Sequence, residues 1–476
     1  MSSLDYTYAF RSIADGFNQV DIINHNKLST KSLLVSIKDF ALFYVSNRQL
    51  PAIVADLVDL ACAIHVVDCT SLQKDDMPSR IHLTLPVRHS EILSKTSIHE
   101  KLQSVLDWYT GNQWSITFTN YTKRGRTPEL QNFLIKNQEH PTTVALWSGG
   151  LDALAGLYHQ LRNDSISHYT LLGAGNNNII FSTQTKVAKR IQEKFPNRTQ
   201  LIQLPIRLNQ SKTVTKNFNQ RARGLVFILL GIACSYQLAQ NTLHLYENGI
   251  GAMNLPFTKA EVGLDHSRSV HPLSLHYISD LIHDILGEPF SIYNPFLFST
   301  KAQMCSLLQQ HAQTDLIFQT ITCDRRHRKE VAQCGYCSSC LLRRQALAAQ
   351  GIGDQTRYVS TELFNKQQII PDATYYNAML FQVEDLRTLL QQPNPWQCLS
   401  KNYSYLQETI DRICGGDEAA KESMKIKFLH MYEHYIHEWD IAKPIIGFEF
   451  LNVEGTASAS RSAKGVMNGQ KYTRFN

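Results

Sequence analysis

The pattern of hydrophobic and polar positions is most regular between residues 141 and 246. Short hydrophobic runs there alternate with longer segments in which hydrophobic residues recur at helical spacing. The pattern predicts strands at 144–147, 169–173, 200–204 and 242–246, with helical spacing at 154–161 and helices at 183–195 and 223–240. Such alternation is typical of βαβ units, so we expect an α/β domain with a parallel sheet covered on both faces.

The segment before this domain has a different pattern. Residues 33–37, 81–87 and 114–118 are predicted strands, whereas 53–64 and 102–109 carry hydrophobic residues at helical spacing. Pro86 favours an edge position for the strand at 81–87, since proline cannot donate to a strand ladder. We expect residues 1–140 to form a small N-terminal α+β domain that ends in a basic, polar connector at 122–128.

Helical spacing dominates the segment after residue 350. Residues 378–439 are predicted to be mostly helical, and Met424, Phe428, Met431 and Tyr435 form one stripe that we assign to the core. The middle domain then covers residues 141–350 and a helical C-terminal extension covers 351–455. Residues 456–476 contain few large hydrophobic side chains and are predicted to be a flexible tail.

The first strand of the middle domain runs into a Ser-Gly-Gly turn. Glycine lets the backbone approach a ligand closely, and the unpaired N–H groups of the following helix, with its dipole, attract anions. An ordinary strand-to-helix turn with two glycines is the alternative, and the lysine of a Walker-type loop is missing. The predicted phosphate-binding residues are Leu146, Ser148, Gly149, Gly150, Leu151, Asp152 and Ala153.

Four cysteines follow one another closely at Cys323, Cys334, Cys337 and Cys340. Four thiolates form the tetrahedral ligand set that Zn²⁺ prefers, and a C-x-x-C step lets two sulfur atoms face one ion. A lone C-x-x-C also suits redox chemistry, but four cysteines leave no open coordination position. We therefore predict a structural zinc site.

Several polar residues follow predicted strands or begin predicted helices. Ligands of open parallel sheets bind beyond the carboxyl ends of the strands, where Asp152 is expected at an exposed mouth. Lys301, at the start of a helix that Thr300 can cap, is unfavourable against the helix dipole unless it faces an anion. Taken singly, each residue also fits a solvated helix start or turn. The further candidates are Arg221, Arg223, Glu247, Asn248 and Arg268.

Composition narrows the class of protein. The 476 residues are 43% hydrophobic and 18% charged, which suits a globular protein with proper cores. The net charge of +6 is spread over the chain, so it does not indicate nucleic-acid binding. The most hydrophobic run, residues 224–239, is too short to span a bilayer, and no signal peptide is evident. We expect a cytoplasmic protein that does not bind membranes.

Two motifs together carry a resemblance. The turn resembles the S-G-G-x-D-S loop (PP-loop) of the N-type ATP pyrophosphatases, with Ala153 in place of the final serine. The cysteine set, followed directly by Arg343 and Arg344, resembles QueC, the 7-cyano-7-deazaguanine synthase family, over residues 141–350. The flanking domains make the chain more similar to QueC-like proteins of bacterial anti-phage defence operons, such as the QatC group. The resemblance implies an adenine-nucleotide α-hydrolase-like, Rossmann-like sheet.

The resemblance also implies an activity. QueC enzymes activate 7-carboxy-7-deazaguanine with ATP, and ammonia then attacks the acyl-adenylate. Carried over, the turn residues hold the ATP phosphates with Mg²⁺, and Asp152, Lys301 and Arg223 are catalytic candidates. The deazapurine is assigned to Arg221, Glu247, Asn248 and Arg268.

The defence-type relatives imply a different acceptor, which is an amine of a partner protein encoded in the same operon. Three hypotheses stay open: a ligase that attaches a deazaguanine to a protein, a plain nitrile synthase of the queuosine route, and a nucleotide-binding module without turnover. Nucleic acid is not required by any of them.

Overall fold

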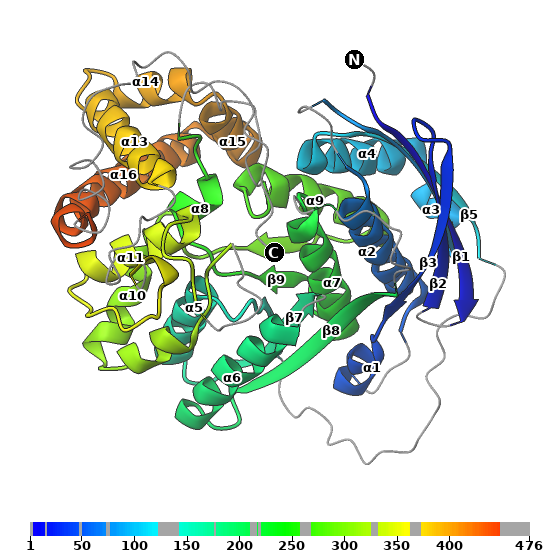
Figure 1. The fold of residues 1–476 in the computed structure, drawn as a ribbon, viewed down its shortest axis with the longest axis horizontal. Coiled ribbons are helices and arrows are strands. Elements are labelled where there is room, and N and C mark those ends of the chain that lie inside the picture. The colour runs from blue at the N-terminus through cyan, green and yellow to red at the C-terminus, as the bar shows by residue number, and fades with distance from the viewer. Residues whose placement is uncertain are drawn as a thin grey trace.

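The computed structural model describes residues 3–14, 17–46, 50–72, 77–121, 142–175, 178–209, 217, 220–257, 268–324, 332–361 and 373–447. Its strands form a ten-stranded sheet in the order β10-β9-β6-β7-β8-β3-β2-β1-β4-β5 (Figure 1). The strands are β1 (Asp5–Ala14), β2 (Phe17–Asn24), β3 (Ser29–Ile37), β4 (Arg80–Val87), β5 (Gln113–Asn120), β6 (Thr142–Leu146), β7 (His168–Gly175), β8 (Thr199–Asn209), β9 (Thr242–His244) and β10 (Ser291–Tyr293).

Helices cover this sheet and continue beyond it toward the C-terminus. The first half of the chain contributes α1 (Phe40–Ser46), α2 (Ala52–Thr70), α3 (Ser90–Leu93), α4 (Thr96–Thr110), α5 (Leu151–Asn163), α6 (Asn178–Lys194) and α7 (Arg223–Gln237). The second half contributes α8 (Gly249–Met253), α9 (Pro272–Leu286), α10 (Lys301–Gln310), the 3-10 helix η2 (Thr314–Gln319), α11 (Ser338–Ala349), α13 (Thr374–Leu390), α14 (Pro395–Asn402), α15 (Tyr405–Cys414) and α16 (Glu418–Ile446).

Strands β6 to β10 form the parallel half of the sheet, in the order β8-β7-β6-β9-β10. The chain moves from β6 to β7 and β8, and then returns to the other side of β6 for β9 and β10. The direction of winding therefore reverses between β6 and β9, and ligands of open α/β sheets bind at such a reversal. The prediction of a mostly parallel α/β sheet with helices is confirmed.

The N-terminal strands extend the same sheet. Residues Leu34–Ile37 of β3 pair antiparallel with Ile206–Asn209 of β8, and one hydrophobic core contains residues from both halves. Helix α2, beside the N-terminal strands, packs against α7, which lies beside the parallel strands (Figure 1). The N-terminal region therefore does not have a sheet of its own. The connector predicted at 122–128 lies outside the described residues.

One expectation about the N-terminal strands is wrong. Strand β4 lies between β1 and β5, so Pro86 is not on an edge strand. The ladder with β1 covers only Arg80–Thr84, and Pro86 lies beyond it. Its missing N–H group is therefore not needed by β1, and the strand can occupy an inner position despite the proline.

The C-terminal helices follow the predicted pattern. Phe428, Met431 and Tyr435 are buried on α16, as the stripe of hydrophobic residues predicts, and Met424 packs at the edge of the same cluster. Helix α16 also packs against α11, so the C-terminal helices share a core with the cysteine region. The tail predicted at 456–476 lies outside the described residues.

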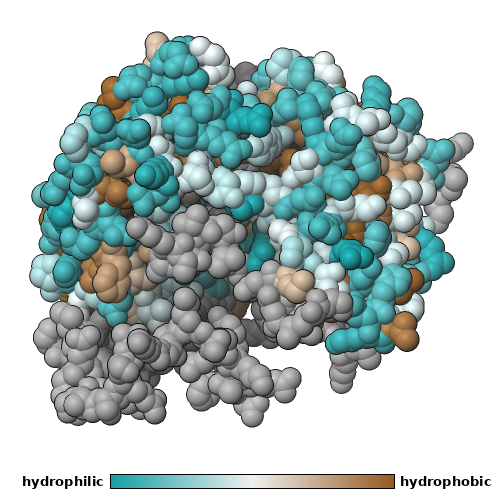
Figure 2. Space-filling model, turned by 90° about the horizontal axis from the view of Figure 1, so that it is seen from above, coloured by the Kyte–Doolittle hydropathy of each residue, from teal (hydrophilic) through white to brown (hydrophobic). Residues whose placement is uncertain are grey.

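The described surface is mainly polar on the face shown in Figure 2. Hydrophilic residues predominate there, and hydrophobic residues stand in small groups. Among the helices that the structure describes, none combines the length and the hydrophobicity needed to cross a membrane.

Candidate active site and metal centre

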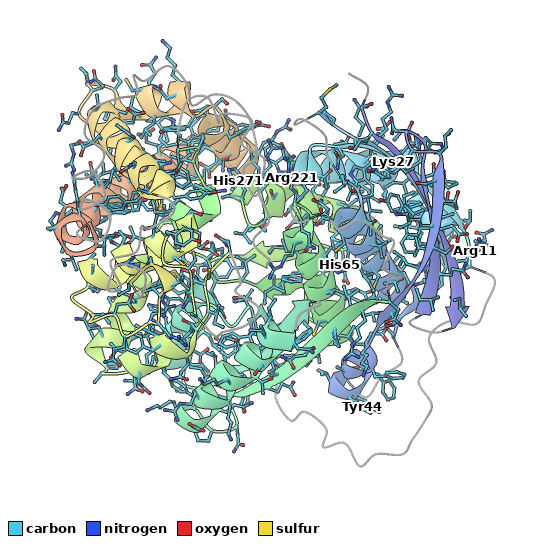
Figure 3. The ribbon with its side chains drawn as sticks, viewed as in Figure 1. Arg11, Lys27, Tyr44, His65, Arg221 and His271 are labelled. Carbon is cyan, nitrogen blue, oxygen red and sulfur yellow. The ribbon has the colours of Figure 1, made fainter. Side chains whose placement is uncertain are left out.

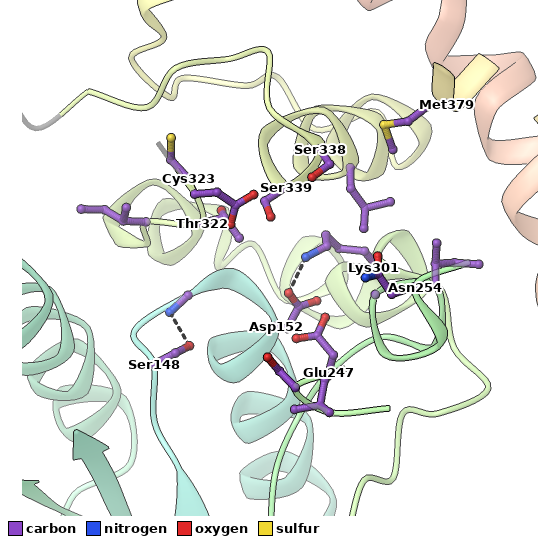
Figure 4. A pocket seen from close by; sticks show the side chains of 18 of the residues that line it. Ser148, Asp152, Glu247, Asn254, Lys301, Thr322, Cys323, Ser338, Ser339 and Met379 are labelled. Atoms are coloured by element: carbon purple, nitrogen blue, oxygen red, sulfur yellow. Dashed lines mark hydrogen bonds and ion pairs between the residues drawn. The ribbon is translucent and has the colours of Figure 1, made fainter. Parts of the chain in front are cut away.

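A cavity of about 560 Å³ lies where β6, β7 and β9 end, at the reversal of the sheet (Figure 4). Its walls come from the β6–α5 turn, the starts of α6, α7 and α10, the cysteine region and the C-terminal helices. The polar and charged residues at its sheet side are Ser148, Asp152, Thr183, Arg223, Glu247 and Lys301. The structure therefore brings together residues from five separate segments of the chain.

The turn has the backbone geometry that the glycines predict. Gly149 has φ of +73°, and a Cβ atom added there would lie 3.1 Å from the backbone nitrogen of Gln184. The N–H group of Gly150 donates to Ser148 Oγ at 3.1 Å, and α5 starts without a side-chain cap. Among the described residues, no side chain caps the backbone N–H groups at the start of α5, so these groups can bind an anion.

The turn residues do not all reach the cavity. Ser148, Gly150 and Asp152 line it, whereas Leu151 and Ala153 are buried in the hydrophobic core. Because Ala153 packs in this core, its methyl group has a structural role at the position where the PP-loop motif has serine. Leu146 is partly buried at the end of β6.

Asp152 and Lys301 form a buried ion pair at the centre of the site (Figure 4). The two residues are 7% and 4% exposed, so the expectation that Asp152 lies at an exposed mouth is wrong. Lys301 opens α10, where Thr300 and Gln303 form the reciprocal capping box that fixes the helix start. A buried lysine at the positive end of a helix needs a negative partner, and Asp152 supplies it.

Glu247 and Asn248 extend this charged group. Asn248 Nδ2 donates to Glu247 Oε1 at 2.8 Å and to Asp152 Oδ1 at 3.2 Å, and its Oδ1 caps α8. Burial, with the nearby Asp152 charge, raises the pKa of Glu247 above its ordinary value. Burial alone would lower the pKa of Lys301, but the charges of Asp152 and Glu247 outweigh it, so the pKa is raised. The lysine therefore stays charged.

Arg223 is a second cation on the cavity wall. It begins α7, and its guanidinium lies over the Phe227 ring at 5.3 Å from the centroid. Burial lowers the pKa of Arg223, while Asp324 opposes this effect. An arginine remains charged despite such a shift, and its fork of donors suits a phosphate or carboxylate.

Three predicted substrate residues do not line this cavity: Asn248, whose amide is bonded to Asp152, Glu247 and the start of α8, Arg221 and Arg268. Arg221 donates from Nη1 to the Thr110 carbonyl at 3.1 Å, and its backbone N–H donates to Asp68 (Figure 3). Arg268 lies over the Trp108 ring at 3.8 Å and donates to the Trp108 carbonyl at 2.7 Å. Both side chains hold the N-terminal helices against the rest of the molecule. Their assignment to the deazapurine stays a prediction that this arrangement does not support.

The four predicted metal ligands meet in a buried cluster. The sulfur atoms of Cys323, Cys334, Cys337 and Cys340 all lie within 4.8 Å of one another, and those of Cys334 and Cys340 are 3.8 Å apart. Zn–S bonds of ~2.3 Å in a tetrahedron place the sulfur atoms about 3.8 Å apart. The cluster could therefore hold zinc, and Cys323 also lines the cavity.

Arg343 and Arg344 support the cysteine cluster. Arg343 is fully buried and donates to Thr320 and Thr322 of the segment that leads to Cys323. Arg344 donates to the carbonyl of Gly335, between the second and third cysteines. The two arginines that carry part of the family resemblance are thus built into the metal centre.

Sequence reasoning missed the far wall of the cavity. Met379, Gln382 and Leu386 line it from α13, and Tyr432 and Tyr435 line it from α16. The spacing of the α13 residues is typical of one helix face, which indicates burial and gives no sign of a ligand.

The fold and this geometry define a mostly parallel α/β protein with a strand-end cavity beside a four-cysteine cluster. Residues 269–351 match the sequence model of a family described as Queuosine biosynthesis protein QueC, which supports a QueC-like family. The match begins at Ser269, on the cavity wall, and runs through the cysteines to the end of α11. A comparison with curated proteins gives no match.

Proposed function

We propose that the protein uses ATP to activate the carboxylate of a 7-carboxy-7-deazaguanine-like molecule and transfers the acyl group to an amine. A carboxylate oxygen attacks the α-phosphorus of ATP, and the bond to the β-phosphate oxygen breaks, releasing pyrophosphate. The amine then attacks the acyl carbon, so that an amide forms and AMP leaves with the bonding electrons. The amine loses one proton in this second step.

The observation that carries the proposal is the position of the Asp152–Lys301 pair beside the Ser-Gly-Gly turn, in a cavity that the QueC-matching segment helps to line. Lys301 and Arg223 supply positive charge, and the start of α5 supplies backbone donors for phosphate. A cavity of about 560 Å³ is of the size that small-molecule sites have.

The carboxylates of Asp152 and Glu247 are oxygen ligands of the kind that Mg²⁺ takes. When bound, Mg²⁺ would offset the phosphate charges, while Lys301 and Arg223 orient the phosphates and stabilise the pyrophosphate that leaves. Zn²⁺ would hold the cysteine cluster together and supplies no reactive position, since four thiolates fill its coordination. Glu247, which lines the cavity, stays a candidate for the deazapurine, whereas the amide of Asn248 is taken up by Asp152, Glu247 and the start of α8.

The proposed acceptor is the N-terminal amine of a partner protein encoded in the same operon, and the proposed setting is anti-phage defence in the cytoplasm. An N-terminal amine, with a pKa of about 7.7–8.0, keeps a usable neutral fraction at physiological pH. Support comes from structure outside the QueC match, because the N-terminal strands and helices, with α14 and α15, add surface that does not line the cavity. A site for ammonia alone would not need these parts.

A plain 7-cyano-7-deazaguanine synthase is the second candidate, and the QueC match itself favours it. Both candidates share the adenylation step. They differ in the acceptor, and the synthase must also remove water from the amide that ammonia gives, which takes a second activation by ATP. The third hypothesis, a binding module without turnover, differs from both in that it releases no pyrophosphate.

Incubation with ATP and labelled 7-carboxy-7-deazaguanine, followed by detection of pyrophosphate, tests the shared step. We expect release that requires both substrates and falls at least about 100-fold in Lys301→Met, because a buried charge at the transferred group is lost. Phe381→Ala, at a position 71% exposed on α13, is the matched control and should react normally. No release by the wild-type protein would leave the binding module as the remaining hypothesis.

A further inference from the structure

The cavity has two chemically different ends. The end beside the turn is charged, whereas the end between α8 and α13 is lined mainly by hydrophobic residues. In the view of Figure 4, Met379 lies at the end away from Ser148. The hydrophobic residues that line the cavity at α8, α13, α16 and the segment after α8 are Ile250, Leu255, Phe257, Met379, Leu386, Tyr432 and Tyr435.

Gln382 is the polar residue of α13 on this wall, and it is only 4% exposed. Its Nε2 donates to the carbonyls of Leu255 at 2.9 Å and Pro256 at 3.0 Å. Both partners are acceptors, so the hydrogen bonds assign the nitrogen and oxygen of the amide without ambiguity. The segment after α8 thus fixes the direction in which Oε1 points.

Among the residues that the structure describes, the hydrogen bonds of Gln382 are the two that its Nε2 donates, and Oε1 takes part in neither. The hydroxyl of Tyr432, a second residue of this wall, also lacks a partner there. Polar groups this deeply buried are usually paired, and an unpaired acceptor in a cavity wall is a position where a ligand donor binds.

We propose that this end of the cavity binds the ring of the second substrate, a flat heteroaromatic molecule, with Gln382 Oε1 accepting a hydrogen bond from its N–H edge. Met379 and Phe257 supply the hydrophobic contacts. The inference rests on the proposed function and names a residue that selects its substrate. Gln382 lies outside the segment that matches the QueC model.

The chemistry of the proposed substrate agrees with this placement. In 7-carboxy-7-deazaguanine the carboxylate is on the five-membered ring, and the ring N–H and exocyclic amine are on the far side of the six-membered ring. A molecule whose donor edge meets Gln382 can therefore direct its carboxylate toward the turn and Lys301. The two ends of the cavity match the two ends of the molecule.

Binding of two ligands tests the proposal. One is 7-carboxy-7-deazaguanine, and the other is the corresponding 7-deazapurine carboxylate, which lacks the ring N–H and exocyclic amine of that edge. Calorimetry with wild-type protein should show at least about a tenfold preference for the first, because a buried acceptor is left unpaired by the second. Gln382→Leu should bind both ligands about equally, with an unchanged affinity for ATP.

A conservative variant separates recognition from a structural role. Gln382→Glu keeps an acceptor oxygen but loses the donors to Leu255 and Pro256, so it should retain the preference that Gln382→Leu loses. Phe381→Ala, on the exposed face of the same helix, should match the wild type, and melting temperatures establish that each variant is folded. Equal weakening of both ligands by both Gln382 variants would overturn the inference and leave the proposed function intact. Failure of the wild-type protein to bind either ligand would overturn both the inference and the proposed function.

Discussion

The two ends of the cavity are built in different ways. The turn end comes from a short run of sequence, Ser148 to Asp152, completed by Lys301, and its charges are already paired with one another. The helical end comes from α13 and α16, more than two hundred residues further along, and its Gln382 has only its donors paired. The turn end is preorganised to bind a charged group. The helical end selects its ligand by shape and by one hydrogen-bond acceptor. The predictions below separate these two ends, from the largest expected effect to the smallest.

Loss of the metal centre should affect both ends at once. Cys323 lines the cavity, and the cysteines share a hydrophobic core with α13 and α16. Cys337→Ser should therefore release zinc and give insoluble protein, because metal binding contributes folding free energy directly. Elemental analysis should find about one zinc per wild-type chain. Stable, active protein without metal would contradict the zinc assignment.

Breaking the ion pair should affect the turn end alone. Lys301→Met leaves the buried Asp152 carboxylate without its positively charged partner, and we expect a loss of about 3–5 kcal/mol of stability and a loss of ATP binding. Arg88→Met is the matched control, since Arg88 Nη1 donates to the buried Asp56 and Asp59 away from the cavity. It should destabilise the fold by a similar amount while leaving ATP affinity unchanged, as denaturant titration and calorimetry can establish. An equal loss of ATP binding in Lys301→Met and Arg88→Met would show that Lys301 affects ATP binding only through the stability of the fold.

A smaller change tests the backbone of the turn. Gly149→Ala places a methyl group at a φ of +73°, within 3.1 Å of the Gln184 nitrogen. We expect the strain to cost about 2 kcal/mol and to weaken ATP binding. The affinity for 7-carboxy-7-deazaguanine, measured without ATP, should stay close to that of the wild type. A normal ATP affinity would show that the turn does not hold the phosphates.

The prediction with the smallest expected effect on the cavity concerns stability as a function of pH. It involves the contact between α16 and the helices beside the cavity. Burial raises the pKa of Glu438 to about 7, although hydrogen bonds from Thr300 and Gln345 oppose the shift. An acid whose pKa rises on folding stabilises the folded state while it is protonated. Its contribution is full below the ordinary value of 4.5 and is lost as pH rises through about 7.

Glu438→Gln should therefore stabilise the protein by up to about 3 kcal/mol at pH 8 and have little effect at pH 4.5. Gln345 Oε1 has no hydrogen-bond partner within the described part of the chain, so it can accept from the new amide after a side-chain rotation. Thermal melts across this pH range give the comparison, and a stability difference that does not vary with pH would contradict the assignment to ionisation.

Local patterns predicted much of the fold and the turn end of the site. The strand-turn-helix at Ser148, the cysteine spacing and the Thr300 cap each depend on residues close together in sequence, and hydrophobic periodicity locates the central strands. The structure contains each of these features, although some bounds differ, since β8 (Thr199–Asn209) extends well beyond the predicted 200–204.

The remainder depends on contacts between distant segments. The pairing of β3 with β8 joins the N-terminal strands to the parallel strands across more than 160 residues of sequence. No local sequence pattern predicts this pairing. In the sequence Arg268 is one arginine of a polar loop. In the structure its guanidinium lies over the Trp108 ring and donates a hydrogen bond to the Tyr405 hydroxyl. The burial of Asp152 depends on Lys301, and Gln382 reads as one more residue of a buried helix face. Side chains of this kind acquire their roles only from the packing of the whole chain.

Intact-mass spectrometry of the partner protein tests the central claim most directly. The protein, ATP and 7-carboxy-7-deazaguanine are incubated with the proteins encoded beside it, with Lys301→Met as the inactive control. We predict that one partner gains the mass of a single deazaguanine amide on its N-terminal residue, only with the wild-type enzyme. An unchanged partner mass with active enzyme, together with accumulation of 7-cyano-7-deazaguanine when ammonia is supplied, would contradict the transfer and identify a plain synthase.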